Sequence, residues 1–497
     1  MLQKLYVFFR KETVLSIAVI LALLSMFWVR PDKAYFTYID FRTLGLLFCL
    51  MAIVAGLKAV GVFDILAKKL LMGTSGIVGV IRLLVLLCFF LSMVITNDVA
   101  LITFVPLALI IVHKLPKELG NYWLLKIVAM QTIAANLGSM LTPIGNPQNL
   151  YLYARAGMSA AELITLMLPY STTALILLLI WIQVAAAKAP HVCGSEKDKT
   201  LLGFSDRKEL NMEYLAAYLI LFTICLLTVA RIIPYQIPLV LVLIYMLLRN
   251  RENISRVDYS LLATFIALFI FIGNLGRIPQ FSSFLERIMA GRETLTAVLA
   301  SQIMSNVPAA LLLSGFTDNY RSLIVGTNIG GLGTLIASMA SLISFKYIAK
   351  ENRNLRGKYL GIFTASNIIF MIFMLILYFF LDKCFPRIIK AMVILSSQKI
   401  LRGTLPSWKK NRREINIFSV LQLLIFIIFR CSEHPEDITI PFHRVHSVDI
   451  IFAHTIFSIL FFKLWFPVCK LYKLFIRAVI ISFILVQLCN LFHFFIC

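Results

Sequence analysis

Charge is scarce in this sequence, and acidic charge is the scarcest. Only 14% of the 497 residues are charged, with 24 Asp and Glu against 47 Lys and Arg, whereas about 25% charged is usual in soluble domains. Hydrophobic residues make up 60% of the chain, and the mean hydropathy is +0.90. The shortage of charge excludes a soluble globular protein and predicts an all-α protein that crosses a membrane several times.

The few cysteines and histidines form no cluster at metal-ligand spacing. The 9 cysteines are scattered without a CxxC pair, and the 7 histidines, including His434, His443 and His446, follow no zinc pattern. We therefore expect no cofactor and no metal beyond a coupling Na⁺. The net charge of +23 is interpreted as membrane topology rather than nucleic-acid binding.

Hydrophobic runs long enough to cross about 30 Å of hydrocarbon recur along the chain. They cover residues 13–29, 43–57, 127–150, 163–186, 213–230, 236–248, 259–276, 322–345 and 359–381. Two further runs, 79–112 and 294–316, carry polar residues at their centres. No small-residue cleavage site follows the first run, so it is predicted to be a transmembrane helix rather than a signal peptide.

Two polar interruptions of these runs match one another without a gap. NLGSMLTPIGNPQNL begins at Asn136, and NIGGLGTLIASMASL begins at Asn328. A second match relates residues 39–71 to 257–289, and Asp40 and Asp258 each precede a predicted helix in it. The chain is therefore predicted to contain two related halves, 1–190 and 213–381, joined by a cytoplasmic linker at 191–212.

The polar-centred runs are predicted to be helical hairpins. Thr96, Asn97 and Asp98 interrupt the first run, and Ser305 and Asn306 interrupt the second. If each hairpin enters and leaves on one side and the N-terminus is cytoplasmic, most Lys and Arg residues of 1–381 fall on the cytoplasmic side. With this topology, the two halves cross the membrane in opposite directions. The predicted fold has two inverted repeats, each with a re-entrant hairpin and a broken transmembrane helix.

Paired broken helices at membrane depth are typical of a transporter binding site. Helix N-termini suit an oxyanion, and the carbonyl oxygens at opposite helix ends suit Na⁺. The candidate substrate-binding residues are Thr96, Asn97, Asn136, Thr142, Gly145, Asn146, Ser305, Asn306, Asn328, Thr334 and Ser338. The candidate coupling-ion residues are Asp98, Asn97, Thr142, Gly145, Asn306 and Gly333. Two structural alternatives stay open. Asp98 could be only a helix N-cap, and the asparagines at the hairpin tips could only form hydrogen bonds with the backbone of their own turns.

The segments that start at Thr96, Leu141 and Ser305, namely TNDVALITFVP, LTPIGNPQNL and SNVPA, resemble the citrate-transporter-like, arsenite-permease and sodium/proton-antiporter branch of the ion transporter superfamily. The resemblance covers about residues 10–381. It implies a dimeric secondary transporter in which hairpins and broken helices form a mobile, elevator-type transport domain and the other helices form a scaffold. Each hairpin tip of the dicarboxylate branch carries Ser-Asn-Thr, which contributes to sodium and carboxylate binding. Here Asp98 and Val307 replace the Thr.

Secondary active transport of a small anion, a carboxylate such as citrate or a dicarboxylate, coupled to Na⁺ or H⁺, is the predicted function. Arsenite export or Na⁺/H⁺ exchange is the alternative, favoured by Asp98 and by the lack of Lys and Arg in the interruptions. A channel needs no paired hairpins, and an enzyme is disfavoured because Asp98 has no acidic or His partner in the motifs.

The expected setting is a bacterial-type cytoplasmic membrane, in which a homodimer contacts lipid and no nucleic acid. Residues 382–497 contain only Gly403 of the chain's 23 glycines. They form an atypical C-terminal extension to which no role is assigned.

Overall fold

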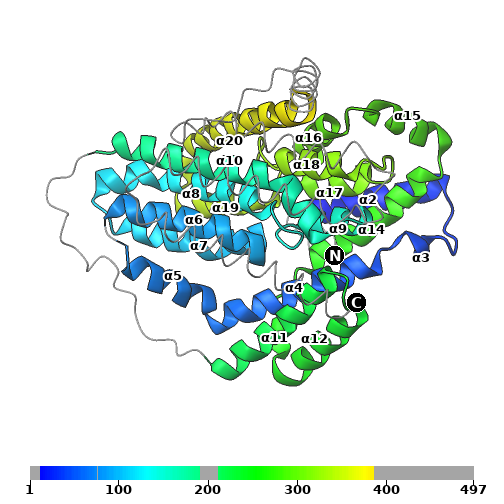
Figure 1. The fold of residues 1–497 in the computed structure, drawn as a ribbon, viewed down its shortest axis with the longest axis horizontal. Coiled ribbons are helices and arrows are strands. Elements are labelled where there is room, and N and C mark those ends of the chain that lie inside the picture. Colours follow the sequence, from blue (N-terminus) through cyan, green and yellow to red (C-terminus); the bar gives the residue numbers. More distant parts are fainter. Residues whose placement is uncertain (1–11, 75, 191–210, 385–497) are drawn as a thin grey trace, which may run out of the picture. The chain divides into compact units, whose positions relative to one another are not determined.

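The computed structural model describes residues 12–74, 76–190 and 211–384, and every regular element among them is a helix (Figure 1). The all-α prediction is therefore confirmed for the described part of the chain. Most of the predicted linker and nearly all of the predicted C-terminal extension lie outside the described residues.

The first half begins with α2 (Thr13–Trp28), α3 (Tyr35–Tyr38), α4 (Phe41–Val60) and α5 (Val62–Met72). It continues with α6 (Ile77–Ile95), α7 (Asn97–His113), α8 (Lys117–Ser139), α9 (Pro147–Arg155) and α10 (Ala160–Ala187). Asp40 is the N-cap of α4, as predicted, and accepts a hydrogen bond from the backbone N–H of Thr43 at 3.0 Å. Ser159 and Glu162 form a capping box at the start of α10.

The second half repeats this order. It contains α11 (Met212–Val229), α12 (Gln236–Arg249), α13 (Arg251–Ile254), α14 (Tyr259–Gly276) and α15 (Pro279–Met289). Then follow α16 (Glu293–Met304), α17 (Asn306–Leu313), α18 (Tyr320–Gly330), α19 (Met339–Glu351), the 3₁₀-helix Arg353–Leu355, α20 (Arg356–Phe379) and the π-helix Phe380–Cys384. Asp258 caps α14 by accepting from the backbone N–H of Leu261 at 2.9 Å. The series from α14 to α20 thus parallels the series from α4 to α10.

Six helical stretches of the described chain are long and apolar enough to cross a membrane. They are Phe41–Val60, Ile77–Ile95, Ala160–Ala187, Met212–Val229, Tyr259–Gly276 and Arg353–Asp382. Three shorter apolar helices are Thr13–Trp28, Asn97–His113 and Gln236–Arg249. The predicted run 127–150 is divided between α8 and α9, and the run 322–345 is divided between α18 and α19. Both interruptions therefore lie where the polar motifs predicted them.

Each hairpin packs on the first part of the broken helix of its own half. Helices α6, α7 and α8 lie side by side, and α16 packs on α18 (Figure 1). Glycine allows α6 to lie close to α8 and α16 to lie close to α18. A Cβ added to Gly138 would lie 2.1 Å from the carbonyl oxygen of Phe89, and one added to Gly330 would lie 2.6 Å from Ser301 Oγ. Between the halves, α2 packs on α14, and α4 packs on α11 and α12.

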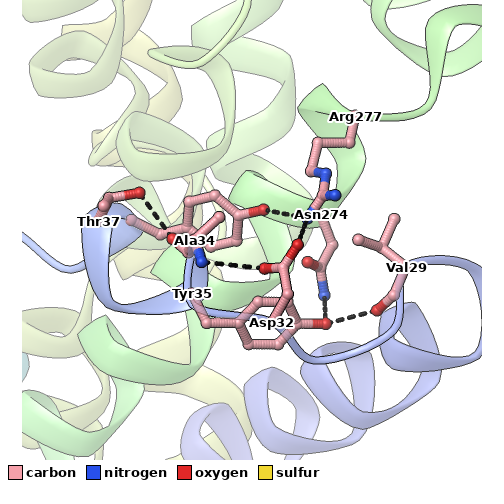
Figure 2. Close-up of polar contacts among 8 residues, drawn as sticks. Val29, Asp32, Ala34, Tyr35, Thr37, Asn274 and Arg277 are labelled. Carbon is pink, nitrogen blue, oxygen red and sulfur yellow. Dashed lines mark hydrogen bonds and ion pairs between the residues drawn. The ribbon is translucent and has the colours of Figure 1, made fainter.

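The segment between α2 and α4 is fixed to the end of α14. Asn274 Nδ2 donates to the hydroxyl of Tyr35 at 2.8 Å, and that hydroxyl donates to the carbonyl of Val29 at 2.5 Å (Figure 2). Arg277 pairs with Asp32 at 2.7 Å in the same cluster. Buried polar groups need such partners, so these contacts join the two halves away from the hairpins.

Candidate functional site

The two hairpin tips share an unusual backbone conformation. Thr96 has φ 74° and ψ 151°, and Ser305 has φ 75° and ψ 155°. Among the described residues, Arg231 is the one other non-glycine residue with a positive φ. Such angles are normally accessible only to glycine and cost about 1–3 kcal/mol, and this kind of strain persists where the surrounding contacts enforce it. The tips are therefore held in place by their neighbours.

Those neighbours are the breaks of the α8–α9 and α18–α19 helices. The backbone N–H of Asn97 donates to the carbonyl of Gly145 at 3.2 Å, and that of Asn306 donates to the carbonyl of Ala337 at 3.0 Å. Gly145 and Ala337 occupy equal places in the matched motifs. Each hairpin tip is thus bound to the break of its own half by the same backbone contact.

A threonine in each break adds a second contact of the same kind. The hydroxyl of Thr142 donates to the carbonyl of Met93, and the hydroxyl of Thr334 donates to the carbonyl of Gln302 at 3.1 Å. Both acceptors lie in the last turn of the first hairpin arm. The predicted threonines therefore hold the geometry of the hairpins, and their hydroxyls point at the backbone.

The asparagines connect the halves in a crossed arrangement. Asn136 Oδ1 accepts from Asn97 Nδ2 at 3.1 Å and from Ser338 Oγ at 3.0 Å. Asn328 Oδ1 accepts from Asn146 Nδ2 at 3.3 Å. Each asparagine at the end of α8 or α18 thus binds the residue that starts the second part of the broken helix in the other half. The two breaks form one buried unit.

A small cavity lies where the tips and breaks meet. Its volume is about 10 Å³, close to the minimum for one water molecule. It is lined by Asn97, Asp98, Pro147, Gln148, Leu261, Asn306, Val307, Ser338 and Met339. Four of these residues, Asn97, Pro147, Asn306 and Met339, are the first residues of α7, α9, α17 and α19. Four helix N-termini therefore converge on one buried space.

Two residues that line this space have an unpaired polar atom. Asp98 Oδ1 and Gln148 Nε2 are buried and have no hydrogen-bond partner in the described protein, and the same holds for Asn146 Oδ1 in the network behind the cavity. A buried polar group without a partner costs about 1–3 kcal/mol, so two such atoms in the lining indicate a site for a ligand. None of the described lining residues is Lys or Arg. Positive potential at the cavity comes from the four helix ends.

The predicted residues fall into three groups. Asn97, Asp98, Asn306 and Ser338 line the cavity. Asn136, Asn146 and Asn328 lie behind it in the hydrogen-bonded network. Thr96, Ser305, Thr142, Thr334, Gly145 and Gly333 shape the tips and breaks. Binding of a substrate or a coupling ion by any of them stays a prediction.

Some lining residues were not predicted. Gln148 is 1% exposed and directly follows the Asn146-Pro147 pair, so its place in the first turn after the break was a usable signal. Leu261 and Met339 carry no such signal, because apolar residues abound in this chain. Their positions depend on how α14 and α19 pack.

The structure agrees with the comparisons to known proteins. Residues 5–320 match the family model described as a citrate transporter, CitMHS. The chain is 32% identical over 364 residues to an uncharacterized transporter of Methanocaldococcus jannaschii, which spans 73% of this chain and 94% of that protein. It is 30% identical over 335 residues to the inner membrane protein YbiR of Escherichia coli, spanning 66% of this chain and 86% of YbiR.

A more distant relative is a 46 kDa membrane protein of Mycobacterium leprae, 21% identical over 354 residues that span 63% of this chain and 80% of that protein. The family match covers well over half of the chain, and the resemblance seen in the sequence motifs is confirmed at the family level. The protein is thus an integral membrane transporter and not an enzyme, and it belongs to the citrate transporter (CitMHS) family.

Proposed function

We propose that this transporter moves a small anion, a carboxylate such as citrate or a dicarboxylate, and couples its movement to Na⁺ or H⁺. The observation that carries the proposal is the convergence of four helix N-termini on one buried cavity. Each N-terminus carries partial positive charge, so together they suit an oxyanion without a fixed Lys or Arg. Asn97, Asn306 and Ser338 would donate hydrogen bonds to it.

Asp98 supplies the link to a cation in this proposal. Its Oδ1 atom is buried beside the anion site without a partner. A carboxylate there opposes a second negative charge unless a proton or a Na⁺ neutralises it. Anion binding would therefore favour simultaneous binding of the cation, which is the requirement for coupled transport.

The cavity also constrains the mechanism. A carboxylate substrate is much larger than the one water molecule that the cavity can hold, so binding requires the tips to separate from the breaks. We propose that α6–α9 and α16–α19 form a mobile transport domain of two inverted repeats with re-entrant hairpins. The scaffold would contain α2, α4, α11, α12 and α14, and the packing of α2 on α14 and of α4 on α11 and α12 supports this division. A homodimer with a cytoplasmic N-terminus completes the proposal.

Flux into proteoliposomes tests the function directly. Citrate, succinate, sulfate and arsenite would be compared under imposed Na⁺ or H⁺ gradients, with Asn97→Ala and Asn306→Ala variants in parallel. We expect gradient-dependent uptake of one carboxylate that falls at least about tenfold in both variants, since each loses a hydrogen bond to a charged ligand. Uptake that neither saturates nor depends on a gradient would contradict coupled transport.

Arsenite export or Na⁺/H⁺ exchange is the second candidate function. It is favoured by the unpaired Asp98 Oδ1 atom and by a cavity that matches a single small ion or water. Asp98→Asn separates the candidates: it should abolish proton-coupled exchange in this second case but only weaken carboxylate uptake, by about tenfold, in the first. Asn keeps the size of the side chain, so the comparison isolates the charge.

A further inference from the structure

A second and larger cavity lies at the C-terminal ends of α9 and α14. This cavity, the vestibule, has a volume of about 180 Å³, which equals that of about six water molecules in the liquid. Two of its lining residues, Thr37 and Arg155, are exposed, whereas Tyr151 and Phe269 are buried. The vestibule therefore leads from the protein surface to a floor of two aromatic rings, and it has room for a small carboxylate.

The vestibule lies in line with the cavity at the hairpin tips. Leu261 of α14 and Gln148 of α9 line the tip cavity, and Phe269 and Tyr151 of the same helices line the vestibule. Phe269 follows Leu261 by eight residues, or about 12 Å along α14, and Tyr151 follows Gln148 by about one turn. Both helices thus run from the tip cavity to the vestibule.

Aromatic rings separate the two cavities. Leu261, Phe265 and Phe269 follow one another at i, i+4 spacing on one face of α14. The ring centroid of Tyr151 lies 5.6 Å from that of Phe269 and 6.5 Å from that of Phe265. Tyr151 belongs to the proposed transport domain, whereas both phenylalanines belong to the proposed scaffold. Movement of one domain relative to the other would therefore separate these rings.

The position of Tyr151 is fixed from the transport-domain side. Its hydroxyl lies 2.9 Å from Ser314 Oγ, and Ser314 Oγ donates to the carbonyl of Leu311 at 2.8 Å. Since the Ser314 proton is used in this way, Tyr151 is the donor to Ser314. Ser314 directly follows α17, so the tyrosine ring is joined to α17 and would move with it.

Arg155 supplies positive charge at the rim of the vestibule. It is the last residue of α9, one turn beyond Tyr151. Three other arginines close to these helix ends have partners in the structure, namely Arg42, Arg231 and Arg277. Among the described residues, Arg155 has neither a hydrogen-bond acceptor nor an ion-pair partner. Its guanidinium is permanently charged and can hold a carboxylate through two parallel hydrogen bonds.

Asp40 is the other charged residue in the described lining, and its carboxylate is engaged elsewhere. Its Oδ1 atom accepts from the backbone N–H of Thr43 at 3.0 Å, and its Oδ2 atom accepts from the hydroxyl of Thr43 at 2.6 Å. The positive end of the α4 dipole also offsets its charge. Arg155 therefore remains the charged group of the vestibule that is available to a ligand.

We propose that the vestibule is a second binding site for a small carboxylate, where Arg155 binds the anion before it passes between α9 and α14 to the hairpin tips. This inference rests on the proposed transport of a carboxylate. Under the predicted topology, the C-terminal ends of α9 and α14 face the outside, so the vestibule receives external substrate. The described lining of the tip cavity contains no Lys or Arg. Fixed positive charge thus acts at the entrance, and the anion leaves the tips without breaking an ion pair.

Uptake kinetics of Arg155 variants in proteoliposomes test the site. Initial rates would be measured against external citrate and succinate at a constant Na⁺ or H⁺ gradient. We expect Arg155→Gln to raise KM about tenfold and to leave Vmax within about twofold, because the residue acts before the substrate reaches the tips. Arg155→Lys keeps the charge without the paired bonds, so its KM should rise only about threefold. An unchanged KM in Arg155→Gln, or a loss confined to Vmax, would overturn the proposal.

Arg287→Gln is the matched control. Arg287 is exposed in the last turn of α15, does not line the vestibule, and lies on the same side of the membrane in the predicted topology. The substitution removes the same charge, and we expect it to leave KM unchanged. A KM that rises equally in Arg287→Gln and Arg155→Gln would overturn the proposal, since surface charge in general would then explain the effect.

Calorimetric titration of citrate into the purified full-length protein separates this site from the proposed function. The Asn97→Ala/Asn306→Ala variant weakens the tip site, and we expect it to retain citrate binding that falls at least about tenfold when Arg155→Gln is added. No retained binding, or binding that does not depend on Arg155, would overturn the vestibule site. Absence of citrate and succinate flux in the wild type would contradict carboxylate transport, whereas citrate binding that depends on Arg155 would still support the site.

Discussion

The two halves of this transporter agree in their backbone and differ in their side chains. Both tips have the same strained residue geometry, and both donate an N–H to the break of their own half. Yet Asp98 stands opposite Val307, and Met93 stands opposite Gln302. The shared contacts are those that any hairpin needs in order to dock on a broken helix. The differences therefore indicate where chemistry distinguishes one half from the other.

The largest expected effect concerns the glycines under the two hairpins. In Gly138→Ala the new methyl group meets the backbone carbonyl of Phe89 at 2.1 Å, whereas in Gly330→Ala it meets the side chain of Ser301 at 2.6 Å. A backbone carbonyl in a helix has less freedom to move than a hydroxyl. We expect Gly138→Ala to lower the free energy of unfolding by about 3 kcal/mol or more and Gly330→Ala by about 1–2 kcal/mol, measured by thermal or denaturant unfolding.

Gly276→Ala is the control for the glycine pair, because nothing lies within 4 Å of a Cβ there and the position ends α14. It should be neutral or slightly stabilising. Equal losses of unfolding free energy in Gly138→Ala and Gly330→Ala would contradict this prediction. They would mean that the backbone around Phe89 shifts as easily as the side chain of Ser301 does.

A smaller effect is expected at the threonines of the breaks. The Thr142 hydroxyl donates to the carbonyl of Met93 and also accepts from the N–H of Gly145 at 3.1 Å. The Thr334 hydroxyl makes one comparable contact and is exposed. Replacement by Val keeps the shape of the side chain, so Thr142→Val should cost about 2 kcal/mol and Thr334→Val less than about 1 kcal/mol.

The unfolding midpoint and gradient-driven flux of both threonine variants would be measured together. A larger loss of stability in Thr334→Val than in Thr142→Val would show that solvent does not replace the lost bond in the second half. We expect gradient-driven flux to fall together with stability in Thr142→Val but not in Thr334→Val.

Sequence patterns predicted the architecture well because its signals are local. Polar residues within apolar runs located both tips and both breaks, and the match of Asn136 with Asn328 located their pairing. The crossed bonds, such as Asn146 to Asn328, were not predictable, since they depend on how the halves pack. For the same reason, the sequence did not predict that Leu261 lines the cavity or that Gln302 contacts the carbonyl groups of Gly330 and Leu332, which lie far from Gln302 in the sequence. The sequence shows the type of each residue, but which residues it contacts is known only from the folded structure.

The smallest expected effect concerns the strained tip residues. Glycine adopts the angles of Thr96 and Ser305 without strain, and this gain of about 1–3 kcal/mol is partly offset by the extra freedom of glycine in the unfolded chain. Ser305 Oγ also lies 3.4 Å from the carbonyl of Ala337, a weak contact that Ser305→Gly would lose. We therefore expect Thr96→Gly to raise Tm slightly and Ser305→Gly to leave it nearly unchanged, whereas Thr96→Ala keeps the strain and brings no gain. If Thr96→Gly lowered Tm instead of raising it, the side chain of Thr96 would contribute more to the tip than the strain costs, and the two tips would differ in the origin of their geometry.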